Sequence, residues 1–256
     1  MPEIPDLNIF RNNLAKRLIG KKLTSISIPI PRRLKLPEDA FKAALEGQVL
    51  TAINRKGKQL YFTFGEHVLS LQLMLYGSMH WYESKNENKF TIAELLFSDG
   101  TGLAITDWQK AVILTLDPEI SKVPDALELS DDYLKTALKK INKPVKTALQ
   151  EGKIVQGIGN AYVDEILYAA NISPFSIAAK IPEKKIDVLT KAIPQVLTDA
   201  EAHISKNFPD TITEKERDFL QVHLPKHKVT PKGEAILVAE IASRKTYYTA
   251  GQELFE

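Results

Sequence analysis

Hydrophobic residues near the start of the chain recur every three or four positions. They are Leu7, Phe10, Leu14 and Leu18. This period places their side chains on one face of a helix, and Gly20 follows them as a suitable helix end. We therefore predict an amphipathic helix over residues 5–19, which would hold the N-terminus against a core.

Short runs rich in β-branched and aromatic residues come next, separated by turn-forming residues. In residues 68–73, leucine stands at every second position, which is the period of a half-buried strand, and Asp99-Gly100 is typical of a hairpin turn. The predicted strands cover residues 23–28, 49–54, 59–64, 68–73, 91–97 and 103–106. Together they predict an antiparallel β-sandwich or barrel, interrupted by a short helix over residues 37–45.

The pattern becomes helical from Asp131 onwards and changes again after His223. The predicted helices cover residues 131–140, 144–152, 160–170 and 183–205. A basic linker, Lys226 to Lys232, then leads into two strand-like runs. These runs, residues 235–241 and 245–249, should pair as a terminal hairpin.

Composition indicates an ordinary globular protein of 256 residues, long enough for more than one domain. The predicted fold class is α+β, with domains at residues 1–125 (β-sandwich), 126–222 (helical) and 223–256 (hairpin). A net charge of +2 permits a nucleic-acid partner without requiring one. The absence of cysteine excludes disulfides, a thiolate nucleophile and a cysteine zinc site. Without an apolar run of eighteen residues, we expect a cytoplasmic protein with no membrane partner.

The N-terminal sequence Met-Pro-Glu-Ile-Pro-Asp carries a possible nucleophile. Removal of Met1 would free the ring nitrogen of Pro2 as a secondary amine, whose pKa of about 8 leaves it partly unprotonated at neutral pH. Its attack on an aldehyde-like carbon gives an iminium, and Glu3 could move protons beside it. While Met1 is attached, the same nitrogen is an unreactive amide. The alternative is a proline that only shapes a turn or protects the chain end.

A second informative stretch covers residues 153–167. Gly157 and Gly159 allow a tight turn, and Asn160 stands where the N-cap of the next helix is predicted. A helix start with Lys153 nearby suits a phosphate. Two glycines before a helix are, taken alone, more often a packing feature than a binding site.

Both stretches resemble signatures of one family. Residues 153–167 are similar to the helix-two-turn-helix motif of the formamidopyrimidine-DNA glycosylase and endonuclease VIII family, and the N-terminal hexapeptide resembles that family's N-terminal motif. The resemblance implies that Pro2 attacks C1′ of a flipped damaged nucleotide, that Glu3 is the acid and base, and that Lys58 binds phosphate and assists catalysis.

The same resemblance implies a DNA-binding surface. Asn160 and Gly159, with Lys153 as a weaker candidate, would hold phosphates beside the flipped nucleotide. The family's terminal hairpin is usually a four-cysteine zinc finger, whereas Ser243 to Tyr248 matches only its arginine-bearing turn. We interpret it as a zincless finger in which apolar and aromatic cross-strand packing replaces the metal and Arg244 enters the minor groove.

No cofactor or metal is therefore expected. His223 and His227 have a zinc-like spacing, but the sequence offers no second pair of ligands.

Substrate preference depends on the loops that fill the gap left by a flipped base. Met74, Leu75 and Tyr76 resemble the single loop of endonuclease VIII, while residues 107–111 lack the arginine and phenylalanine of the oxidised-purine branch. Residues 219–233 are also short for the loop that caps 8-oxoguanine. Oxidised pyrimidines are favoured on this basis. Two residues depart from the family pattern and leave base preference open, namely Ile4 and Asp6.

The predicted function is a bifunctional DNA glycosylase and AP lyase of base excision repair. Its partner would be double-stranded DNA containing damaged bases or abasic sites, and we expect a monomer that associates with the nucleoid. The alternatives are an inactive protein that binds damaged DNA or abasic sites, and a glycosylase of the oxidised-purine branch.

Overall fold

A computed structural model describes residues 1–256, with the side chain of Asp131 left out of the description. The chain divides into two compact units. One comprises Met1–Ile120 with Ser205–Lys215, and the other Ser121–Ile204 with Glu216–Glu256. The predicted division into three domains stays a prediction, and each unit is described by itself.

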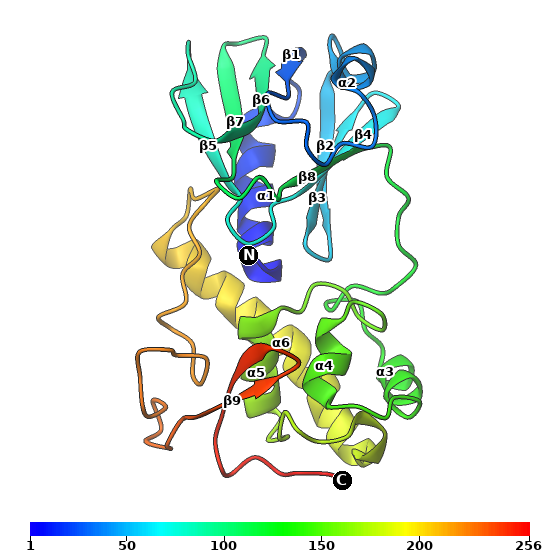
Figure 1. Ribbon diagram of the computed structural model, residues 1–256, viewed down its shortest axis with the longest axis vertical. Coiled ribbons are helices and arrows are strands. Elements are labelled where there is room, and N and C mark those ends of the chain that lie inside the picture. Colours follow the sequence, from blue (N-terminus) through cyan, green and yellow to red (C-terminus); the bar gives the residue numbers. More distant parts are fainter. The chain divides into compact units, whose positions relative to one another are not determined.

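Two antiparallel four-stranded sheets and an N-terminal helix build the first unit (Figure 1). Helix α1 is Ile4–Leu18 and helix α2 is Glu38–Leu45. One sheet has the order β1-β6-β7-β5, with β1 (Leu23–Ser27), β6 (Thr91–Phe97), β7 (Thr101–Thr106) and β5 (Ser78–Glu83). The other has the order β2-β3-β4-β8, with β2 (Leu50–Lys56), β3 (Gln59–Phe64), β4 (His67–Gln72) and β8 (Ile113–Leu116).

The core of this unit lies between α1 and the inner faces of the sheets. The apolar stripe of α1 is buried in it, through Leu7, Phe10, Leu14 and Leu18. The alternation in β3 has the same cause, because Leu60, Phe62 and Phe64 point inward and the residues between them do not. The predicted α+β class, with a β-sandwich and an N-terminal helix, is confirmed.

Strands β5 and β8 are absent from the strands that we predicted. In β5 only Met79 is buried, so the hydrophobic alternation that marks a strand is missing. Its pairing with β7 places Tyr82 opposite Gly102. A Cβ atom on Gly102 would lie 2.2 Å from the ring of Tyr82, so the glycine leaves room for that ring.

The second unit is helical and ends in a hairpin. Its elements are α3 (Asp131–Leu138), α4 (Val145–Gln150), α5 (Asn160–Ala169), the 3₁₀ helix η1 (Ala178–Lys180), α6 (Glu183–Asn207, whose last three residues belong to the first unit), β9 (Leu237–Ile241) and β10 (Arg244–Tyr248). Helix α6 has an apolar stripe that is buried at Ile186, Leu189 and Ile193. The helical domain and the terminal hairpin are both confirmed.

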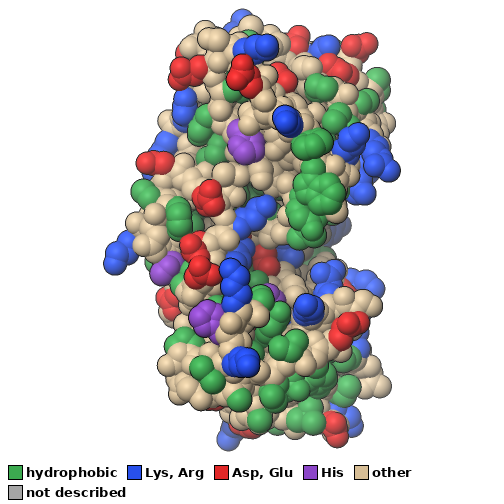
Figure 2. Space-filling model, turned by 60° about the vertical axis from the view of Figure 1, so that its left-hand side comes forward, with side chains coloured by type: hydrophobic (Ala, Val, Ile, Leu, Met, Phe, Trp, Pro, Cys, Tyr) green, Lys and Arg blue, Asp and Glu red, His purple; other side chains and the backbone are tan. Residues whose placement is uncertain are grey.

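Basic and acidic side chains are nearly balanced, 34 against 32, and Figure 2 shows the two kinds interspersed over the face that it draws.

Within the described part of the chain, no helix combines the length and the apolar character that crossing a membrane requires.

Candidate active site

Pro2 and Glu3 lie buried at the start of α1. Glu3 is the N-cap of this helix. Its backbone N–H donates to Asp6 Oδ2 at 2.8 Å, and its carboxylate accepts the backbone N–H of Asp6, which completes a capping box. Asp6, one of the two departures from the family pattern, therefore anchors the N-terminus. Ile4, the other departure, is fully buried in the first turn.

Lys58 lies in the tight turn between β2 and β3. Lys56 pairs with Gln59, so that Gly57 and Lys58 form a two-residue turn, and Gly57 has a φ of +57°. A positive φ at the first turn residue favours glycine. Lys58 is the second turn residue and is partly exposed at the end of the hairpin.

Arg55 joins this turn to the N-terminal helix. Its Nε donates to Asn8 Oδ1 at 2.6 Å, and its Nη1 donates to the carbonyl of Gly57 at 3.0 Å. Because Asn8 lies in α1 and Gly57 precedes Lys58, one guanidinium fixes the lysine turn relative to the helix that begins after Glu3. In Figure 1 the N-terminus and the turn between β2 and β3 lie at the same end of the first unit.

The loop between β4 and β5 presents apolar side chains to solvent. Met74 has a φ of +54° and is half-buried, while Leu75 and Tyr76 are 52% and 42% exposed. Only glycine fits at position 77 of this loop, because a Cβ atom there would lie 2.0 Å from the carbonyl oxygen of Leu73. Exposed apolar groups on so constrained a loop are suited to binding.

The loop from Asp107 to Val112 meets the first loop through an aromatic contact. Buried Asp107 accepts backbone N–H groups from Gln109, Ala111 and Val112, which fixes the turn. Trp108 is 56% exposed, and its ring centroid lies 4.9 Å from that of Tyr76 at an interplanar angle of 54°. Sequence reasoning missed Trp108, although an aromatic residue in a polar turn was a visible signal.

In the second unit, α5 begins at Asn160, and its N-cap is Gly159, one residue before the N-cap that we predicted. Asn160 Nδ2 donates to the carbonyl of Lys245 at 3.0 Å, and Gln150 Nε2 donates to Asn160 Oδ1 at 3.1 Å. Lys153 is 77% exposed, with its Nζ 3.5 Å from Glu151 Oε2. The start of α5 carries the positive end of the helix dipole, which suits a phosphate.

Arg244 is exposed at the first position of β10, directly after the hairpin turn. Ala242 and Ser243 form that turn with φ of +49° and +59°, the geometry of a two-residue hairpin. Leu237 and Val238 of β9 are exposed. The cross-strand packing that we predicted therefore leaves these two apolar side chains in contact with solvent.

The residues present do not fit a zinc ion in the hairpin. The chain has no cysteine, and no group of three or more possible ligands occurs in the part of the chain that the structure describes. His223 Nδ1 lies 2.8 Å from Asp164 Oδ2, and His227 is exposed. His223 is thus engaged with a carboxylate of α5.

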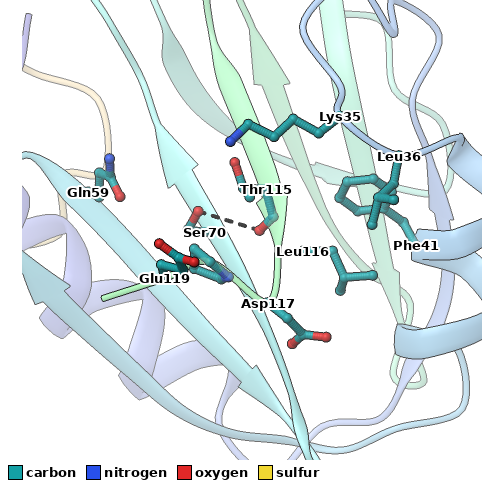
Figure 3. A pocket seen from close by; sticks show the side chains of 10 residues that line it. Lys35, Leu36, Phe41, Gln59, Ser70, Thr115, Leu116, Asp117 and Glu119 are labelled. Atoms are coloured by element: carbon teal, nitrogen blue, oxygen red, sulfur yellow. Dashed lines mark hydrogen bonds between the residues drawn. The ribbon is translucent and has the colours of Figure 1, made fainter. Parts of the chain in front are cut away.

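A cavity of about 530 Å³ opens on the sheet that contains β4 and β8 (Figure 3). Its wall combines Lys35 with Asp117 and Glu119, and Ser70 Oγ donates to the carbonyl of Thr115 at 3.4 Å. None of the predicted site residues lines it. The candidate active site is therefore distinct from this cavity.

Comparisons with known proteins cover most of the chain. Residues 1–112 match the formamidopyrimidine-DNA glycosylase N-terminal domain, and residues 120–208 match the formamidopyrimidine-DNA glycosylase H2TH domain. A formamidopyrimidine-DNA glycosylase of Halalkalibacterium halodurans is 32% identical over 215 residues, which is 78% of either chain. One of Bacillus subtilis is 31% identical over 214 residues, again 78% of either chain.

Solved structures agree over almost the full length. The Lactococcus lactis Fpg in complex with abasic-site DNA has a TM-score of 0.86 and 25% identity, over 97% of this chain and 98% of that one. A MutM complex with DNA containing carbocyclic 8-oxo-G has a TM-score of 0.86 and 27% identity over the same shares.

Proposed function

This chain belongs to the formamidopyrimidine-DNA glycosylase family, and on that premise we propose that Pro2, freed by removal of Met1, is the nucleophile of its glycosylase and AP lyase reactions. The chain is a DNA-binding repair enzyme of this family. The observation that carries the proposal is the Arg55 bridge, which holds the Lys58 turn against the helix that Glu3 caps.

The proposed reaction begins with a damaged nucleotide flipped out of the duplex. The Pro2 nitrogen attacks C1′, and the base leaves with the electrons of the broken glycosidic bond. The nitrogen loses its proton, the C1′–O4′ bond breaks as O4′ takes up a proton, and the nitrogen lone pair forms an iminium with the opened sugar. Glu3, the next residue along the chain, whose carboxylate the capping box orients, transfers protons to and from the deoxyribose. The iminium then acts as an electron sink, so that elimination of the strand phosphates nicks the DNA.

The remaining predicted residues have binding roles in this proposal. Lys58 holds a phosphate beside the lesion, as a partly exposed lysine on a fixed turn can do. Asn160 and Arg244 bind flanking phosphates from the second unit, with Gly159 opening the helix and Lys153 adding charge. Leu75 and Tyr76, supported by Met74, fill the gap in the base stack.

For the substrate we propose oxidised purines, including ring-opened ones. The relatives are formamidopyrimidine-DNA glycosylases, and the similar structures include complexes with DNA containing 8-oxo-G or FAPY-dG. The preference for pyrimidines that we predicted finds no support among them. Oxidised pyrimidines stay a second candidate, favoured by the apolar loop at Leu75 and Tyr76 and by the short segment after Phe219.

Borohydride trapping tests the nucleophile. The protein, with Met1 removed as verified by intact mass, is incubated with an abasic duplex and borohydride, which reduces an iminium to a stable covalent bond. We expect one cross-link, mapped by peptide mass spectrometry to Pro2. A cross-link mapped to Lys58 would contradict the assignment, and so would no cross-link at all.

Matched variants separate chemistry from binding in the same assay. Lys58→Ala should still trap at saturating DNA, but with weaker binding. Glu3→Gln should bind abasic DNA and lose most excision, because it keeps the size of the side chain and removes its charge. Equal excision by Glu3→Gln and the native protein would exclude Glu3 as the acid and base.

A panel of duplexes tests the substrate proposal. It contains 8-oxoguanine, formamidopyrimidine-guanine, thymine glycol, dihydrouracil and 5-hydroxyuracil, each measured under single-turnover conditions. We expect the fastest excision with the two purine lesions. Faster excision of the three pyrimidine lesions would instead establish the second candidate.

A further inference from the structure

A buried ion pair lies beneath the terminal hairpin. Lys146, from α4, and Asp164, from α5, have side chains with 0% exposure, and Lys146 Nζ lies 2.8 Å from Asp164 Oδ1. Charges removed from water in this way are tolerated only where further hydrogen bonds satisfy them. The partners of this pair therefore show what it holds in place.

The ammonium group of Lys146 is directed at β10. Its Nζ donates to the carbonyl of Lys245 at 3.1 Å and to Thr246 Oγ1 at 2.9 Å. The ammonium group therefore combines an ion pair with Asp164 and two hydrogen bonds to β10. One fully buried charge thus binds two successive residues of the hairpin strand.

The second oxygen of Asp164 extends the cluster in two directions. Asp164 Oδ2 accepts the backbone N–H of Tyr247 at 3.1 Å and lies 2.8 Å from Nδ1 of His223. The imidazole of His223 also meets the ring of Tyr247 edge to face, with centroids 4.6 Å apart. The carboxylate therefore connects α5, β10 and the segment around His223.

The neighbouring residue of α5 secures that segment. Glu165 accepts the backbone N–H groups of Gln221, Val222 and His223 at 2.7–2.8 Å. Burial raises the pKa of Glu165, and the three N–H groups oppose that effect by favouring the carboxylate. His223 is consequently presented to Asp164 from a fixed backbone.

These contacts specify the register of the hairpin. They use the carbonyl of Lys245, the hydroxyl of Thr246 and the N–H of Tyr247, which are polar atoms of three successive residues. A slip of β10 by one residue would turn every side chain to the opposite face and leave the buried charges without partners. Apolar packing alone would discriminate less sharply between registers.

The cluster also meets the two residues proposed to bind phosphate in this unit. Asn160 Nδ2 donates to the same Lys245 carbonyl as Lys146, at 3.0 Å, and Arg244 is the residue directly before it. We propose that Lys146, Asp164 and His223 are positioning residues that hold Arg244 and Asn160 in binding geometry in the absence of a metal. This proposal rests on the proposed function, in which Arg244 binds DNA.

The test measures binding of the full protein to an abasic duplex by fluorescence anisotropy, and borohydride trapping at saturating DNA. His223→Gln, at the edge of the cluster, should raise Kd about tenfold, and Lys146→Met should raise it further, since each removes a hydrogen bond to a charged group. The trapping rate at saturation should stay unchanged in both. His203→Gln, an exposed histidine of α6, is the matched control and should bind like the native protein.

A double-mutant cycle separates positioning from general damage to the fold. If Lys146 and His223 act through the hairpin arginine, adding Lys146→Met or His223→Gln to Arg244→Ala should raise Kd little beyond Arg244→Ala alone. Multiplicative effects, or unchanged Kd in the folded single variants, would overturn the proposal. If circular dichroism shows Lys146→Met unfolded, the His223→Gln arm of the cycle decides. Failure of the native protein to trap would refute the proposed function instead.

Discussion

At the scale of single residues, Trp108 and Tyr76 are conspicuous because large aromatic surfaces face solvent on rigid loops. Gly77 leaves room for the side chain of Val112, because a Cβ atom on residue 77 would lie 2.7 Å from Cγ2 of Val112. Asp107 fixes the other loop through three backbone N–H groups. Both rings are thus held in place before any ligand binds, which reduces the entropy lost on stacking against a base.

We expect Trp108→Ala and Tyr76→Ala to slow excision of a damaged base about tenfold or more, because stacking of an aromatic ring on a base contributes roughly 1–3 kcal/mol. Cleavage at an abasic site, where no base has to be flipped, should change less. Single-turnover rates on both substrates give the ratio, and 2-aminopurine fluorescence beside the lesion reports flipping. Leu36→Ala, an exposed apolar residue elsewhere in the unit, is the control. Equal losses on both substrates would contradict a role in gap filling.

At the scale of elements, short turns decide where functional residues stand. Lys58 and Arg244 each lie in or directly after a two-residue hairpin turn whose backbone requires positive φ. The turn between β6 and β7 combines a positive φ at Gly100 with a charged residue. Asp99 accepts the N–H of Thr101 at 3.0 Å and pairs with Lys21 Nζ at 2.5 Å, which ties this turn to the start of β1.

The charge on Asp99 predicts how stability depends on pH. The hydrogen bond from Lys21 lowers the pKa of Asp99 from 3.8 to about 2. A carboxyl whose pKa is depressed by folding stabilises the fold above the unfolded value and loses that contribution as pH falls through the folded one. Asp99→Asn should therefore lower the melting temperature slightly at pH 7, and the difference should vanish between pH 4 and pH 2. A difference that persists at pH 2 would assign the effect to packing.

At the scale of the whole molecule, the first unit recruits a segment from far along the chain. Asn13 Nδ2 in α1 donates to the carbonyls of Pro209 and Thr211, at 2.8 and 2.9 Å, across nearly 200 residues of sequence. Ile212 from the same segment is buried in the core around α1. The first unit is consequently completed only after the helical domain has been traversed.

Removing that connection should destabilise the protein measurably. Asn13→Ala leaves two backbone carbonyls without their donor and should lower the free energy of unfolding by about 1–3 kcal/mol. Urea denaturation followed by circular dichroism gives the value. Asn12→Ala, which loses only a contact with its neighbour Arg11, should change it by less than about 0.5 kcal/mol. Similar losses in both variants would show that the connection contributes nothing specific.

The sequence by itself determined the elements with a strong local period, such as α1, β3 and α6, and the two signatures around Pro2 and Asn160. These features depend on residues within a few positions of one another, so the linear order contains them. Tertiary structure alone decided which side chains meet, as in the pair of Tyr76 with Trp108 and the cluster of Lys146, Asp164 and His223. Such contacts join residues tens of positions apart, and their free energy arises only when packing brings the partners together and excludes water.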